Sequence, residues 1–175
     1  MKKYLFYFLV FSGLQFSVSA QPKPDLPKLT EAQKAETLAF NSTAVHAGSI
    51  AYAKSMGKTP KEYGRAIGKL FIPSWKQGAK SGQELRGLVE HMNSVAQAFN
   101  CPFKLTSWSA REAIIRRGKL LQDPRTASLF TSLGVTAQDM EAWNEGVMGE
   151  ISTSLGYSLS QRQEGKDVVV TVKKL

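Results

Sequence analysis

The sequence predicts an α+β domain that is mainly helical and carries a small antiparallel sheet of about three strands. The first indication is a series of helix start signals, each followed by apolar residues at spacings of three and four. The second is a change to an alternating pattern after Gly156, which predicts a β-hairpin over residues 157–174. A lone hairpin is marginally stable in water, so we expect a further strand beside it.

The N-terminus has the organisation of a cleavable export signal. Two lysines precede an apolar run, and Val18-Ser19-Ala20 supplies a small-residue cleavage site. The apolar run is too short to span a bilayer, so cleavage after Ala20 predicts a periplasmic or secreted protein with no transmembrane segment in its mature chain. The 175 residues then divide into a signal peptide, 1–20, a Pro-rich flexible leader, 21–29, and a single α+β domain, 30–175.

The helices are predicted from residues that cap helix N-termini. The expected starts are Thr30, Thr59-Pro60, Ser81, Ser109, Asp123-Pro124 and Thr136. The first helix is expected to end near Met56 with Gly57 as its stop. Its residues Leu38, Val45, Tyr52 and Met56 share one apolar face. Pro73 is expected to end or kink the second helix, because proline lacks the backbone donor.

The strands are predicted from alternation. Residues 103–107 alternate apolar and polar side chains and form the expected third strand beside the C-terminal hairpin. A hairpin turn centred on Glu164-Gly165 pairs Leu159 with Val170, which keeps apolar pairs on one face.

The charge of the chain favours an acidic partner. The net charge is +9, and removal of the two signal lysines leaves +7. Two helices are expected to carry basic rows. The first row is Lys58, Lys61, Arg65 and Lys69, and the second is Arg111, Arg116, Arg117 and Lys119. An alternative function for an exported protein with such a face is a protein- or envelope-interaction module. We expect no nucleic acid as its partner. Ordinary solvated charge explains the same pattern.

Few residues are available for catalysis or metal binding. The chain has two histidines and one cysteine, and it lacks the spacings of zinc sites, phosphate-binding loops and serine hydrolases. We therefore expect no metal and no cofactor, although one histidine such as His46 is sufficient to hold haem. The catalytic alternative is a small hydrolase in which Cys101 acts with His91 or His46 as its base. An inert, buried cysteine is the simpler interpretation of Cys101.

Aromatic side chains are abundant for one small domain. Ligand pockets are lined mainly by apolar and aromatic groups. The leading hypothesis is therefore an exported small-molecule-binding domain without catalytic activity, which holds a partly apolar ligand between its helices and its sheet. The expected ligand-binding residues are Tyr52, Trp75, Trp108 and Trp143. The same rings also suit a packed core.

Overall fold

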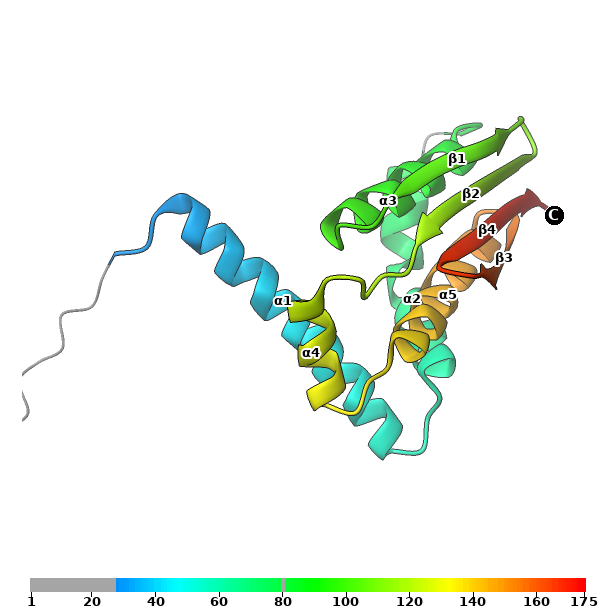
Figure 1. Cartoon of the computed structure of the whole chain (residues 1–175). Helices are drawn as coiled ribbons and strands as arrows, with labels where there is room; N and C mark the ends of the chain where they lie inside the picture. Colours follow the sequence, from blue (N-terminus) through cyan, green and yellow to red (C-terminus); the bar gives the residue numbers. More distant parts are fainter. Residues whose placement is uncertain (1–27, 80) are drawn as a thin grey trace, which may run out of the picture.

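The computed structural model describes residues 28–79 and 81–175, in which five helices and four strands are found (Figure 1). The elements are α1 (Glu31–Ser55), α2 (Pro60–Gly78), α3 (Glu84–Ala98), β1 (Phe103–Trp108), β2 (Glu112–Gly118), α4 (Pro124–Ser132), α5 (Ala137–Ser154), β3 (Tyr157–Glu164) and β4 (Asp167–Lys174). The mainly helical α+β class is confirmed. The predicted signal peptide and residues 21–27 of the predicted leader lie outside the described residues.

The sheet has four antiparallel strands in the order β1-β2-β4-β3, where about three were expected. The additional strand is β2, which lies in the stretch predicted as a helix after Ser109, and it separates β1 from the hairpin. Ser109 does accept from the backbone N–H of Glu112, as a helix cap would, but here that bond closes the β1–β2 turn. A Ser-x-x-Glu sequence satisfies both geometries. The neighbouring pair Ile114-Ile115 favours the strand, because β-branched side chains pack well on a pleated surface.

The C-terminal hairpin forms in a register two residues away from the predicted one. Leu159 pairs with Val172 instead of Val170, and Glu164 pairs with Asp167 around a two-residue loop. Gly165 takes the first loop position with a φ of +60°, where glycine is favoured because it has no Cβ. A shift of two residues leaves every side chain on its predicted face, so the division into apolar and polar faces is preserved.

Helices α3 and α5 pack against one face of the sheet and form the main core with it. The side chains of this core are almost completely buried, among them Leu88, Ile115, Ile151 and Val172. The other face of the sheet carries charged side chains, with Arg116 bonded to Glu164 and Asp167 across three strands. Successive side chains of a strand point to opposite faces of the sheet, and this explains the period of two in the sequence.

Helix α2 packs closely against α5 through glycines. A Cβ placed on Gly64 would lie 2.2 Å from the backbone oxygen of Trp143, and one on Gly146 would lie 2.3 Å from that of Lys61. The two backbones therefore approach at a distance that no residue with a side chain allows. This crossing positions the C-terminal half of α2, which continues through Pro73 to Gly78 and does not end at the proline.

A second core joins α1 and α4 to the start of α5, with Ile50, Phe130 and Met140 fully buried in it. The N-terminal part of α1 extends away from the rest of the molecule (Figure 1). The helix starts predicted at Thr30, Thr59 and Thr136 are all present, and each threonine forms a capping box with the residue three positions on. Across the described ranges, none of the helices combines the length and the apolar character needed to cross a bilayer.

Candidate functional site

A pocket with a volume of about 560 Å³ lies between the end of α2 and the beginning of α3. Trp75 and Leu155 supply its large apolar surfaces. Charged side chains of α3 line it as well, namely Glu84, Arg86 and Glu90. Its volume falls in the range of about 300–1,000 Å³ that small-molecule sites occupy. We call this space the α2–α3 pocket.

The local sequence explains why the α2–α3 pocket is open. Gly78 and Gly87 lie in its wall, and a Cβ on either glycine would meet no atom within 4 Å. Trp75 reaches the pocket because α2 continues past Pro73. The indole ring is partly buried against the main core and meets the ring of His91 edge-on, with 5.0 Å between the ring centroids. The tryptophan is therefore fixed on one side and open to the pocket on the other.

The charges of the pocket lie along α3. Arg86 donates to Glu90 at 2.7 Å, and this exposed hydrogen bond raises the pKa of the guanidinium. Glu84 accepts from the backbone N–H of Gly82. The ring of His91 is partly desolvated, which lowers its pKa below the ordinary value and favours the neutral form. The pocket thus combines an apolar side at Trp75 with charged groups of both signs at α3.

The four predicted ligand residues are not brought together. Trp75 lines the α2–α3 pocket, whereas Tyr52, Trp108 and Trp143 are absent from its lining. Tyr52 lies on the outward face of α1 and is 68% exposed, and Trp108 lies on β1, an edge strand, and is 50% exposed. Trp143 packs against both cores and meets His46 edge-on at 5.2 Å.

The interior between α3, α5 and the sheet is almost filled. The cavity there, which His91, Arg117 and Leu159 help to line, has a volume of about 10 Å³. This is close to the smallest space that holds one water molecule. The structure therefore leaves more room for a ligand at the ends of α2 and α3 than in the interior between α3, α5 and the sheet.

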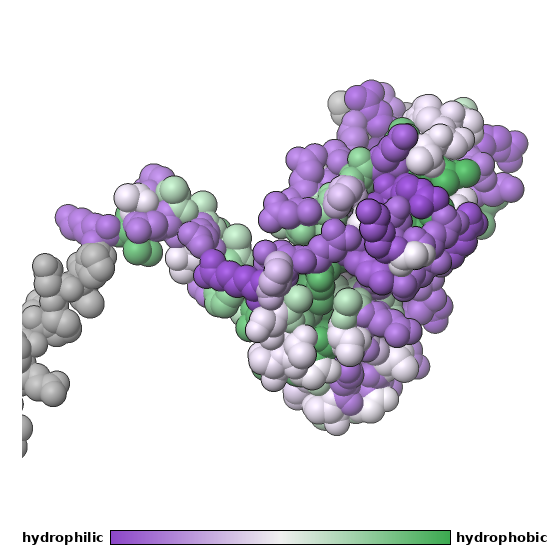
Figure 2. All heavy atoms as spheres, in the orientation of Figure 1, coloured by the Kyte–Doolittle hydropathy of each residue, from purple (hydrophilic) through white to green (hydrophobic). Residues whose placement is uncertain are grey.

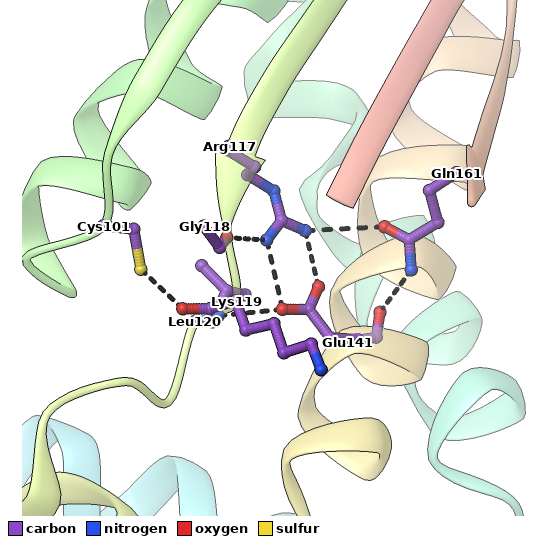
Figure 3. A network of polar contacts seen from close by, with 7 residues as sticks. All are labelled: Cys101, Arg117, Gly118, Lys119, Leu120, Glu141 and Gln161. Atoms are coloured by element: carbon purple, nitrogen blue, oxygen red, sulfur yellow. Dashed lines mark hydrogen bonds and ion pairs between the residues drawn. The ribbon is translucent and has the colours of Figure 1, made fainter. Parts of the chain in front are cut away.

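A buried ion pair lies in the interior (Figure 3), and its arginine, Arg117, also lines the small cavity. Arg117 is 4% exposed and donates two hydrogen bonds to Glu141, at 2.6 and 3.1 Å. Glu141 also accepts from the backbone N–H of Leu120 at 2.8 Å, and its own carbonyl accepts from Gln161 at 3.0 Å. The network joins β2, α5 and β3. Since both charges are satisfied, it positions these elements and leaves no free group for chemistry.

Sequence reasoning missed this role of Arg117, which was placed in a basic row on a helix. The row does not exist, because residues 112–118 form β2. In a strand Arg117 shares the inward face with Ala113 and Ile115, and all three are buried. The sequence did contain a signal for this burial, because positions 113, 115 and 117 alternate along a strand and point to the same face.

The other predicted basic row, on α2, is partly neutralised by α5. Lys61 pairs with Glu145 at 2.8 Å, and Arg65 lies 4.0 Å from Glu150. Exposed pairs of this kind contribute little to stability, but they reduce the positive potential of the face.

Cys101 and the two histidines lie apart. The thiol is 7% exposed and donates to the carbonyl of Lys119 at 2.8 Å (Figure 3). Burial raises its pKa, which disfavours the thiolate. His91 faces Trp75, and Nδ1 of His46 lies 3.0 Å from the carbonyl of Ser42. Among the described residues, neither histidine is a hydrogen-bond partner of Cys101, and no three His, Cys, Asp or Glu side chains are grouped as a metal site requires.

Comparisons with protein-family models, with curated proteins and with solved structures find no match for this chain.

Proposed function

We propose that this protein is an exported binding domain that holds a small, partly apolar ligand in the α2–α3 pocket and performs no reaction on it. The observation that carries the proposal is the coincidence of a pocket of about 560 Å³ with Trp75, a large ring that is anchored on one side and open on the other. Export rests on the N-terminal signal pattern, which predicts a periplasmic or secreted location.

The chemistry of the pocket defines the class of ligand. Trp75 and Leu155 favour an apolar or aromatic portion, because an aromatic face contributes both buried area and ring stacking. Arg86 and Glu90 satisfy each other at 2.7 Å and remain exposed, so a polar portion of the ligand can bond to either without leaving a buried charge. The absence of a thiolate–histidine pair in the described structure supports binding over hydrolysis.

The first experiment is native mass spectrometry of the protein purified from the envelope of its own host. We expect a reproducible additional mass that is lost on denaturation, and its value identifies the ligand class. The released compound is then titrated back while tryptophan fluorescence is followed.

The decisive variant is Gly87→Leu, which places a large side chain in the α2–α3 pocket. Nothing lies within 4 Å of the Cβ position of Gly87, so the branch point of the new side chain meets no neighbour, and leucine replaces a poor helix former. We expect binding to be lost while the melting temperature is kept or raised. Gly149→Leu on α5 is the matched control, because that glycine also faces open space but lies outside this pocket. Unchanged binding in the Gly87→Leu protein would overturn the proposed site.

A further inference from the structure

Helix α1 is apolar on two faces, and the structure covers one of them. Ala47, Ile50 and Ala53 are buried against the second core. On another face Leu38, Val45, Tyr52 and Met56 are exposed by 72, 70, 68 and 63%. Figure 2 shows hydrophobic residues along α1 where it leaves the rest of the molecule. A helix with two apolar faces normally has a neighbour on each of them.

The exposed face has the spacing of a coiled-coil seam. Its residues recur at alternating intervals of three and four, and we call this row the α1 seam: Ala35, Leu38, Ser42, Val45, Ser49, Tyr52 and Met56. The large apolar members Leu38, Val45 and Tyr52 recur every seven residues with small residues between them, and this produces a narrow stripe of the form that pairs with one other helix. The period is maintained through most of a helix of 25 residues, which is about 37 Å long at 1.5 Å per residue.

The sizes of the seam residues indicate what the partner is. Small residues (Ala35, Ser42, Ser49) alternate with large ones (Leu38, Val45, Tyr52). An antiparallel second copy sets large against small in the six layers from Ala35 to Tyr52: Ala35 faces Tyr52, Leu38 faces Ser49 and Ser42 faces Val45. A parallel copy would set serine against serine and leave voids, which close-packed interfaces exclude.

We propose that the α1 seam binds the α1 seam of a second copy of this chain, as an antiparallel helix pair with two-fold symmetry. The two-fold axis passes between Thr43 and Ala44, midway along the paired segment. The rest of each molecule packs on another face of its α1, near the C-terminal half, so the two bodies lie at opposite ends of the pair.

The pairing also explains how the N-terminal half of α1 is maintained. This half is held to the body through the exposed side chain of Arg125, which pairs with Glu36 at 2.9 Å and lies 5.2 Å from the ring centroid of Phe40. The N-terminal half of α1 is short enough to be only marginally helical in water when nothing packs against it. A single helix seam is a small contact beside the roughly 800 Å² per partner of a standard interface, and we expect a dissociation constant on the order of micromolar.

Sedimentation velocity of the purified full chain, from about 1 to 200 μM, tests the association. We expect a concentration-dependent dimer. Leu38→Glu or Val45→Glu should weaken it by at least about 100-fold, because each charge enters the interface twice. Leu70→Glu on α2 is the matched control, since Leu70 is 74% exposed outside the seam. Circular dichroism verifies that all three variants fold.

A chain that stays monomeric over this range would overturn the proposal. A monomer that floats with vesicles containing anionic lipid, and loses this binding in Val45→Glu, would assign the face to a membrane surface and overturn it equally.

Disulfide trapping tests the direction of the pair. Ser42→Cys and Val45→Cys proteins with different mass tags are mixed and oxidised, while the buried Cys101 stays inaccessible. The antiparallel pair predicts that mixed dimers exceed both self-linked species. A predominance of self-linked Val45→Cys dimers would indicate parallel helices and overturn the proposed arrangement.

Discussion

Replacing Gly146 by alanine tests the close crossing of α2 and α5. The new Cβ would lie 2.3 Å from the backbone oxygen of Lys61 and 2.9 Å from the backbone nitrogen of Arg65, whereas ordinary contact begins at 3.4 Å. Both opposing atoms belong to the backbone, so no side-chain rotation relieves the overlap and the helices must separate by about 1 Å. Overpacking of this kind costs about 1–3 kcal/mol, and occasionally more.

Gly149 on the same helix provides the matched comparison, because a Cβ there meets no atom within 4 Å. Alanine at this position should stabilise the protein by about 0.5–1 kcal/mol, the difference in helix propensity. At Gly146 the same gain is outweighed, and we expect a net loss of about 1–2 kcal/mol, or a melting temperature lower by about 2–8 °C. Urea unfolding followed by circular dichroism measures both variants. If Gly146→Ala is as stable as Gly149→Ala, the helices do not cross as closely as described.

Three further predictions concern the buried polar groups and the caps. Removing one member of the buried ion pair, by Arg117→Met or Glu141→Leu, should destabilise the fold by about 3–5 kcal/mol in urea unfolding, whereas the double variant should regain much of the loss; equal losses in all three would contradict the pairing. Cys101 should resist iodoacetamide at neutral pH until the protein unfolds, because burial raises the pKa of its thiol; rapid labelling of the folded protein would restore the hydrolase alternative. The pKa of Asp123 is lowered because the carboxylate accepts the backbone N–H of Thr126, so its contribution to stability is full above the unfolded pKa and is lost as the pH falls through the folded pKa. The urea concentration at the unfolding midpoint should therefore decrease as the pH drops below about 5. The decrease should be less steep in Asp123→Asn, because asparagine keeps a cap without a titrating group. Identical pH profiles of the two proteins would argue against this assignment.

The predicted pocket and the observed one differ because volume is not encoded in residue type. Trp75 and Trp143 have equivalent sequence signatures, an aromatic ring on an amphipathic helix. Trp143 packs between two cores, while Trp75 borders open space because Gly78 and Gly87 leave its surroundings unfilled. A glycine can permit close approach, as at Gly146, or leave a gap, and the sequence alone does not distinguish these two outcomes.

The sequence by itself determined the α+β class, the capped starts at Thr30, Thr59 and Thr136, and the C-terminal hairpin. These depend on interactions within a few residues, such as a hydroxyl that accepts a nearby N–H or a side-chain period of two or 3.6.

The tertiary structure alone decided the features that depend on distant parts of the chain. The stretch after Ser109 became β2 because Ile115 pairs with Val170 of β4, and burial against α5 turned Arg117 from an expected surface charge into half of an interior ion pair. The α1 seam remained exposed because no distant part of the described chain packs against it. Its spacing is local, but whether an apolar face is buried depends on which surface lies opposite to it, and that surface comes from another part of the fold or from another molecule.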